Sequence, residues 1–557
     1  MKKWTLYLQL ALVIGLVGCG QDQAPQLVVH NAQLITIDSS TQGSTAFAVK
    51  DGLFQQVGSD AEILALAGPA TQVLDLQGQT LLPGFNDAHC HSLGLPPGSV
   101  ELGDVTSLAG LKIRLQERAT KVPPGGWVIG HGYDDTNFGG HLSRQDLDRL
   151  VADHPVLLIH GSLHLFLVNS LALDNAGIDS ATQDPAGGFY RRDAQGDPTG
   201  LIGERSALAP LFNDRQPSPY VGGLSAGLAG LKNFMKLALE NGITSYSDAM
   251  VPTSLALMYW WVDPAELGVR VNIMFDVDSL GSARVIKSLD QGLSYLGLQP
   301  FSNPWLRGRT IKLFHGMSLS GRTARMHQPY ADRPGYYGEP PQRSQQQLND
   351  IIADIHRDGF QAAVHANGDY EIDMVLNAYA QLGEQESRAA RHRIEHGSVV
   401  NADILQRMSD LGVVLAPHSY IYEKGPMMEA YGDQRWPWMF ANASTFEYGV
   451  VNAANSDYPV SALSPLRRIQ SLVTRQSRAG KIYGPQQRLT VEQALWAYTM
   501  GGAHASFEED SKGSITAGKY ADFVILSDDP RQVAVENIHA ITVQATYSAG
   551  VLRYAQP

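Results

Sequence analysis

The stretch Leu81–His91, LLPGFNDAHCH, decides how the rest of the chain is interpreted. Its apolar first residues and polar end are typical of a buried strand that leads into a loop. Side chains two positions apart on a strand point to the same side, so His89 and His91 project together while Cys90 points away. Two neighbouring imidazoles at the end of a strand suit one divalent cation, although two surface histidines in a loop would give the same letters.

Other strand-like segments also end in residues that bind metals. Apolar runs further along the chain lead directly to His365, His396 and Asp457. Such runs alternate with amphipathic helical stretches between residues 81 and 456, which predicts parallel βαβ units. The carboxyl ends of all strands in a parallel barrel meet at one face, where active sites are built. We therefore expect these side chains to converge with the two histidines of the first strand.

The pattern predicts an α/β protein with two parts. About ten strand-like segments exceed the eight of a (β/α)8 barrel, so we expect a distorted TIM-like barrel over residues 83–509, with an insertion at about 125–220. Residues 27–82 and 510–557 instead carry short apolar runs separated by turn signals. Each end is too small to bury a sheet face alone. Together they predict one small β-sandwich built from both termini.

Composition excludes two classes of protein. The 557 residues include 42 Lys and Arg against 55 Asp and Glu, a net charge of −13 at pH 7. An acidic chain lacks the positive field that nucleic-acid binding requires, so we expect no nucleic-acid partner. Two cysteines are too few for a disulfide scaffold or for a zinc finger of the four-cysteine type.

Residues 1–18 are typical of a secretory signal. Two lysines precede the apolar stretch 4–17, whose 14 residues are fewer than the about 20 that span a bilayer as a helix. The stretch ends in LVGC, which resembles the bacterial lipobox, where the cysteine is lipidated and becomes the new N-terminus. This predicts lipidation at Cys19, a tether over residues 19–26, and a membrane-anchored protein of the cell envelope facing the periplasm. Gly20 favours the outer membrane. An uncleaved membrane anchor is the alternative.

The order of the metal-binding residues, with a lysine between them, resembles the amidohydrolase superfamily of metal-dependent hydrolases. More narrowly, the chain is similar to the family 3 branch, which includes N-substituted formamide deformylases. The supporting segments are spread over nearly the whole chain: residues 82–89 (LPGFNDAH), 186–189 (AGGF), 198–200 (PTG), 365–369 (HANGD), 393–396 (RIEH) and 518–522 (GKYAD).

The resemblance implies a metal site with one or two divalent ions, most simply zinc. His89 and His91 would bind the first ion with Asp457 close to it, and His365 and His396 the second. Lys312 matches a strand-four lysine that such enzymes often carbamylate to bridge two metals. An unmodified ammonium would repel the cations, so a rim lysine or a substrate contact, with a single-metal site, is the alternative.

The same resemblance implies a mechanism, in which metal-activated hydroxide attacks an amide-like carbonyl. Asp457 would pass the proton of the water to the leaving nitrogen, unless it serves only as a ligand. His164 and His418, at loop edges, would stabilise an oxyanion, bind substrate or play a structural part. Arg322 would meet a substrate anion or an internal carboxylate.

The leading hypothesis is thus an amidohydrolase that acts on a small molecule and cleaves a carbon–nitrogen bond other than a peptide bond. An ester, lactone or carbamate hydrolase with the same metals is one alternative, because substrate choice resides in loops. A catalytically silent envelope binding protein is another. The presence of Asp457 argues against the latter, since a binder needs no proton shuttle.

Overall fold

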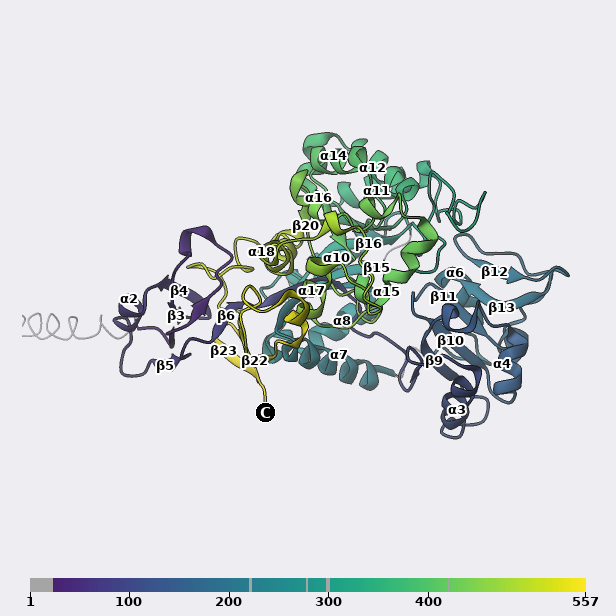
Figure 1. The fold of residues 1–557 in the computed structure, drawn as a ribbon, viewed down its shortest axis with the longest axis horizontal. Helices are drawn as coiled ribbons and strands as arrows, with labels where there is room; N and C mark the ends of the chain where they lie inside the picture. The colour runs from purple at the N-terminus through teal and green to yellow at the C-terminus, as the bar shows by residue number, and fades with distance from the viewer. Residues whose placement is uncertain (1–23, 220–222, 277–278, 297–300, 419) are drawn as a thin grey trace, which may run out of the picture.

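The structure is a computed structural model that describes residues 24–219, 223–276, 279–296, 301–418 and 420–557 (Figure 1). The predicted signal segment and the lipidation at Cys19 lie outside these residues. Within them, no helix combines the length and the apolar composition needed to cross a bilayer.

An eight-stranded parallel sheet forms the centre of the molecule. Its strands follow one another in chain order, each hydrogen-bonded to the next. Backbone hydrogen bonds from Ala88 to Ala454 (3.2 Å) and from Asp457 to His89 (2.9 Å) join its first strand to the segment that follows its last. This is the predicted TIM-like arrangement. The strands are β7 (Phe85–Cys90), β14 (Ile243–Val251), β15 (Arg270–Asp276), β16 (Leu306–Phe314), β17 (Gln361–Ala366), β18 (Arg393–His396), β19 (Val414–Pro417) and β20 (Val451–Asn452).

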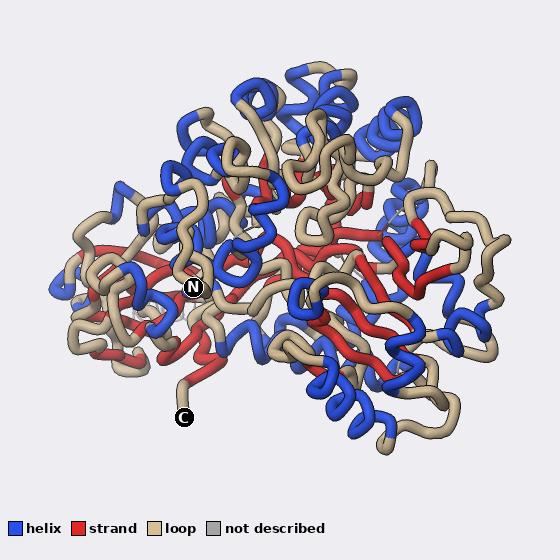
Figure 2. The backbone as a smooth tube through the Cα atoms, turned by 45° about the vertical axis from the view of Figure 1, so that its right-hand side comes forward, coloured by secondary structure: helices blue, strands red, loops and turns tan. Residues whose placement is uncertain are grey.

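Amphipathic helices cover the outside of this sheet (Figure 2). In α11 (Gln345–Arg357), Leu348, Ile351, Ile352 and Ile355 are buried, the spacing of a helix with one apolar face. Ser344 caps its first turn in a capping box. Other helices around the barrel are α7 (Gly223–Glu240), α8 (Thr253–Val262), α10 (Ser282–Tyr295), α12 (Asp369–Ala380), α14 (Ala402–Asp410) and α17 (Pro465–Thr474).

A separate six-stranded sheet lies between β7 and β14 in the sequence. The strand-like segments near residues 130 and 158 belong to this sheet and not to the barrel. This explains why the sequence contains more strand-like segments than the eight of the barrel. Apolar clusters pack against both of its faces. In spatial order its strands are β12 (Phe189–Arg192), β13 (Pro198–Gly203), β11 (Leu165–Val168), β10 (Val156–His160), β9 (Val128–Tyr133) and β8 (Val100–Glu101).

Both ends of the chain build the remaining two sheets. One contains only N-terminal strands, in the order β4 (Leu53–Gly58), β3 (Ala46–Lys50), β1 (Leu27–His30) and β5 (Gln72–Asp75). The other combines both termini, in the order β2 (Gln33–Leu34), β6 (Thr80–Pro83), β21 (Phe523–Leu526), β22 (Val543–Ser548) and β23 (Val551–Ala555). Phe47 and Phe523 pack edge to face in their shared core, with ring centroids 5.1 Å apart. Only Gly84 separates β6 from β7, so the sandwich connects directly to the strand that contains His89 and is followed by His91.

Candidate metal centre and active site

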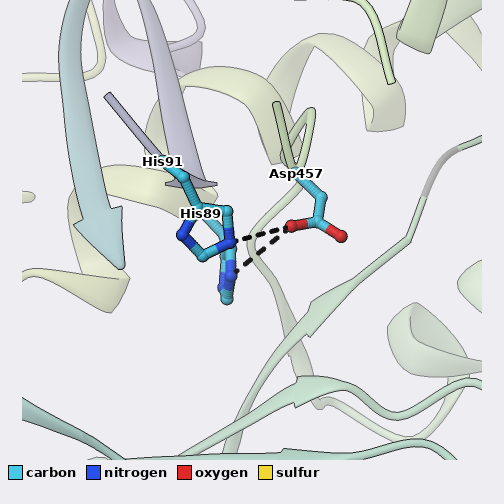
Figure 3. A group of neighbouring side chains, drawn as sticks. All are labelled: His89, His91 and Asp457. Atoms are coloured by element: carbon cyan, nitrogen blue, oxygen red, sulfur yellow. Dashed lines mark ion pairs between the residues drawn. The ribbon is translucent and has the colours of Figure 1, made fainter. Parts of the chain in front are cut away.

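His89 and His91 meet Asp457 at the carboxyl end of β7 (Figure 3). The Nε2 atoms of the two histidines lie 3.7 and 3.4 Å from the same oxygen, Asp457 Oδ1. His91 Nδ1 is 3.0 Å from the carbonyl oxygen of Ala249, a contact that leaves Nε2 facing the carboxylate. One donor atom from each residue lies within 4.8 Å of the others, an arrangement that could hold one metal ion.

A second group of possible ligands shares the same carboxylate. His396, His418 and Asp457 also offer donor atoms within 4.8 Å of one another. The rings of His396 and His418 stack at 4.1 Å, and His418 Nδ1 is 3.6 Å from Asp457 Oδ2. His396 and Asp457 have positive φ angles of 75° and 50°. Non-glycine residues in this conformation cluster at functional sites.

The chemistry of the donor set fits a cation. His89 Nε2, His396 Nδ1 and His418 Nδ1 are buried and have no hydrogen-bond partner among the described residues, which is rare for buried polar atoms. Burial lowers the pKa of His89 to about 4 and that of His418 to about 3. Both rings are therefore neutral near pH 7, with lone pairs available to a metal.

Asp457 is ionised in the same surroundings. Burial by itself raises the pKa of its carboxyl group, but the hydrogen bond from His91 and the neighbouring His89 and His418 rings outweigh burial and hold that pKa well below its usual range. The site thus combines neutral imidazoles with one carboxylate, a combination that zinc accepts.

Glu395 and Arg393 support His89 from inside the barrel, and the sequence analysis assigned neither a role. The Glu395 carboxylate contacts His89 Nδ1, and Arg393 binds that carboxylate through Nε and Nη2 at 2.7 and 2.9 Å. Burial alone raises the pKa of Glu395, but the charge of Arg393 and the hydrogen bond with His89 lower it to about 2. A carboxylate on the second ring nitrogen fixes the orientation of a metal-binding histidine. Strand alternation could have shown that residues 393 and 395 share a face, but not that this face meets β7.

Lys312 and His365 lie beside the two groups of possible ligands that share Asp457, but belong to neither. The His365 ring is 4.5 Å from that of His396, while its Nε2 is 3.2 Å from the carbonyl oxygen of Met317. Lys312 is 1% exposed. Burial lowers the pKa of its ammonium group to about 8, although the charges of Glu395 and Asp457 oppose that shift.

The six-stranded sheet contributes His164, which follows β10. Its ring lies 4.9 Å from that of His365 and 5.1 Å from that of Phe314. Its Nδ1 is 3.0 Å from the carboxylate of Glu204, another residue that the sequence analysis did not single out. No motif in the sequence links these two positions, which lie 40 residues apart.

Arg322 binds an internal carboxylate. Its Nη2 contacts Asp135 on the six-stranded side, and the same carboxylate accepts a 3.2 Å contact from His160 Nε2. Asp134, Asp135 and His160 form a third cluster of potential ligand atoms. Cys90 is buried, and its Sγ lies 3.5 Å from the carbonyl oxygen of Ser247, away from the metal centre.

Residues 72–554 match the model of the amidohydrolase family. The chain belongs to the amidohydrolase family. The Bacillus subtilis protein YtcJ is 30% identical to it over 547 residues, covering 94% of this chain and 98% of that protein. The N-substituted formamide deformylase of Arthrobacter pascens is 29% identical, covering 96% and 99%.

A solved structure shows the same fold. It is an uncharacterized metal-dependent hydrolase from Pyrococcus horikoshii OT3, with a TM-score of 0.71 and 23% sequence identity, covering 92% of this chain and 99% of that one. The amidohydrolase assignment makes the protein a hydrolase, and the histidines around Asp457 are its candidate metal ligands.

Proposed function

We propose that this amidohydrolase uses zinc to cleave a carbon–nitrogen bond, other than a peptide bond, in a small amide-like substrate. The observation that carries the proposal is the position of Asp457, whose two oxygens face two different groups of histidines. The 29% identity to an N-substituted formamide deformylase, over nearly the full length of both chains, supports the choice of bond.

Three side chains would hold the first ion, namely His89, His91 and Asp457. His396 would hold a second ion with His365 as predicted or with His418, which lies nearer to Asp457 in this structure. Lys312 would bridge the two ions if carbamylated, a reaction that needs its neutral amine. A divalent cation held here lowers the pKa of water to about 7 and polarises a carbonyl group.

A side chain of the protein would transfer the proton of the attacking water. The Asp457 carboxylate accepts a proton from the attacking water and delivers it to the departing nitrogen. This delivery makes amide cleavage possible, because an amine is a poor leaving group until it is protonated. His164 would bind the substrate or its developing oxyanion, as would His418 if it is not a ligand of the second ion, and Arg322 would hold Asp135 at the rim.

A substrate panel tests the proposal. Zinc-loaded protein is assayed on N-formyl amines, N-acyl amino acids and matched esters, with Asp457→Asn as the control. We expect turnover of one or more amides and a loss of about 10²–10⁴-fold in kcat for Asp457→Asn. Faster turnover of the esters would favour the ester hydrolase alternative, and no turnover of either would favour a binding protein.

We also propose that the protein is anchored in the cell envelope through a lipidated Cys19 and faces the periplasm. The lipobox-like residues 16–19 support this location, because they imply that Cys19 is lipidated. Several acyl chains on the cysteine would hold the protein on a membrane far better than one chain. Cys19→Ser should move the protein from the membrane fraction to the soluble periplasmic fraction. Continued membrane association of this variant would contradict lipidation as the sole anchor.

A further inference from the structure

A buried carboxylate joins two segments of backbone at the carboxyl end of the barrel. Glu371, in the first turn of α12, is fully buried, and its two oxygens accept four backbone N–H groups. Oε1 accepts from Met317 at 2.8 Å and from Arg325 at 2.7 Å. Oε2 accepts from Asn367 at 2.9 Å and from Gly368 at 3.0 Å. One side chain thus connects the turn after β17 to a loop after β16.

Helix capping accounts for only half of these contacts. A glutamate at the third position of a helix often accepts from the amide that precedes the helix, and Oε2 does so here. Oε1 instead reaches Met317 and Arg325, which lie 54 and 46 residues earlier in the chain. A Cβ at Gly316 would lie 2.3 Å from Glu371 Oε2, so a glycine leaves room for the carboxylate. The glutamate therefore also holds both ends of the loop 317–325.

The loop 317–325 fixes the position of Arg322. Within the loop, the amides of Thr323 and Ala324 both donate to the Ser318 carbonyl oxygen at 3.0 Å. Arg322 itself has a positive φ of 56°. Residues other than glycine that adopt this conformation cluster at functional sites. The backbone thus sets the direction in which this side chain leaves the loop.

Arg322 docks the loop on the six-stranded sheet. Its guanidinium binds the carboxylate of Asp135, the first residue of η2 (Asp135–Phe138), which follows β9. Charge-assisted hydrogen bonds are about twice as strong as neutral ones, and this carboxylate is only 7% exposed. The loop also packs on the sheet directly, since a Cβ at Gly321 would lie 3.3 Å from Leu165 Cδ1 on β11. The loop is therefore a docking point between the sheet and the barrel.

The docked sheet and the loop enclose the metal centre. The candidate ligands His365, His396 and Asp457 are only 2%, 3% and 5% exposed. The ring of His164, which follows β10 of the six-stranded sheet, lies 4.9 Å from that of His365. At the start of the loop, the Met317 carbonyl oxygen is 3.2 Å from His365 Nε2. A substrate at the metal centre would therefore lie between the sheet and the barrel.

We propose that Glu371 is a positioning residue for substrate binding, which acts through the loop 317–325 and Arg322 to hold the six-stranded sheet closed over the metal centre. This inference rests on the proposed function, since it assumes that a small substrate binds there. Glu371 holds the ends of the loop, the loop orients Arg322, and Arg322 holds Asp135. Weaker docking raises KM, because only the closed arrangement encloses the substrate and the apparent affinity falls with its population.

Hydrogen exchange, followed by mass spectrometry on the zinc-loaded protein, tests the docking without turnover. In Glu371→Gln, an NH2 group replaces one acceptor oxygen and faces two N–H donors. This variant should speed exchange about 10-fold or more in residues 317–325 and in residues 135–140, whereas Arg322→Ala should do so only in residues 135–140. Glu371→Asp, which is one methylene shorter, should repeat the pattern if Glu371→Gln does not fold. Unchanged exchange of residues 135–140 in the Glu371 variants would overturn the proposal.

A double-mutant cycle on KM tests the consequence for the substrate, with any amide of the panel that is turned over. Burial raises the pKa of Glu371 to about 7, so the assays are run at about pH 8, where most of these carboxyl groups are ionised. Glu371→Gln and Arg322→Ala should each raise KM about 10-fold and change kcat less. The double variant should raise KM no further than Glu371→Gln, because the two residues act in series. Independent, multiplicative increases would overturn the proposal.

The control is a buried carboxylate that joins two helices on the outside of the barrel. Asp354 in α11 accepts the Gly281 N–H, at the start of α10, at 2.7 Å and binds Arg357. Asp354→Asn should lower Tm, as Glu371→Gln does, but leave KM and the exchange of residues 135–140 unchanged. An equal rise of KM in this variant would show that lost stability explains the effect, and would overturn the proposal. If no amide is turned over, the proposed function fails, and the exchange pattern still decides this inference.

Discussion

Glu395 shapes the metal centre without binding a cation itself. Its carboxylate contacts His89 Nδ1 and is in turn held by Arg393, and all three side chains are fully buried. Glu395→Gln keeps the shape but removes the charge that orients the His89 ring. We expect the zinc affinity to fall about 10–100-fold, measured by competition with a chromophoric chelator. An affinity equal to that of the wild type would show that the metal is held independently of His89.

His91 differs from His89 in its support, which gives a matched comparison. Its Nδ1 contacts the carbonyl oxygen of Ala249, and its side chain is 27% exposed. We expect His91→Ala to lose bound zinc, as His89→Ala does, but to retain more of the thermal stability. The reason is that His89→Ala empties a fully buried position beside Glu395, whereas the His91 side chain is partly exposed. Calorimetry of both variants without metal checks this order, and equal losses of Tm would contradict it.

At the scale of elements, the junction between sandwich and barrel sets the position of β7. A Cβ at Gly84 would lie 2.2 Å from Thr244 Oγ1 and 2.8 Å from Thr244 Cβ on the neighbouring strand β14. Gly84→Ala should therefore lower the free energy of unfolding by about 2 kcal/mol and weaken zinc binding through displacement of His89. Gly292→Ala, in α10, is the control because nothing lies within 4 Å of its added methyl group. A stable, fully loaded Gly84→Ala protein would contradict this account of the junction.

The elements also show what the sequence could predict. His89, His91 and Asp457 converge because strand alternation and the common direction of parallel strands fix where a residue at a strand end must point. These rules predict the direction of side chains on a single strand, but not which side chains of distant strands touch. The contact of Glu395 with His89 crosses the barrel, and that of Glu204 with His164 depends on how another sheet folds back. His418 was singled out only as a loop-edge histidine, since its stacking on His396 depends on two separate strands.

At the scale of the whole molecule, both termini complete one core. Phe523 from the C-terminal part packs against Phe47 and stacks on Tyr547 with ring centroids 4.5 Å apart. Deleting residues 510–557 removes three strands from the sheet that contains β6. We expect the truncated chain to be insoluble or to lose its cooperative thermal transition. A soluble truncated protein with a wild-type Tm would show that the barrel folds without the sandwich.

The buried histidines also give the whole protein a dependence on pH. Burial lowers the pKa of His89 from 6.5 to about 4 in the folded chain, so the unfolded chain binds more protons between these values. The stability that this histidine contributes is therefore complete above about pH 6.5 and is lost as the pH falls toward 4. Metal binding shifts in the same direction, since protons compete for the ligands. Tm and zinc affinity should both decrease from pH 7 to pH 5, and a higher Tm at pH 5 would contradict the assignment.

The most direct test is an anomalous X-ray difference map of zinc-loaded crystals, recorded on both sides of the zinc absorption edge. The account predicts a peak bonded to His89, His91 and Asp457, with any second peak beside His396. Zinc elsewhere in the molecule, or a protein that takes up no zinc, would contradict a metal centre built around Asp457.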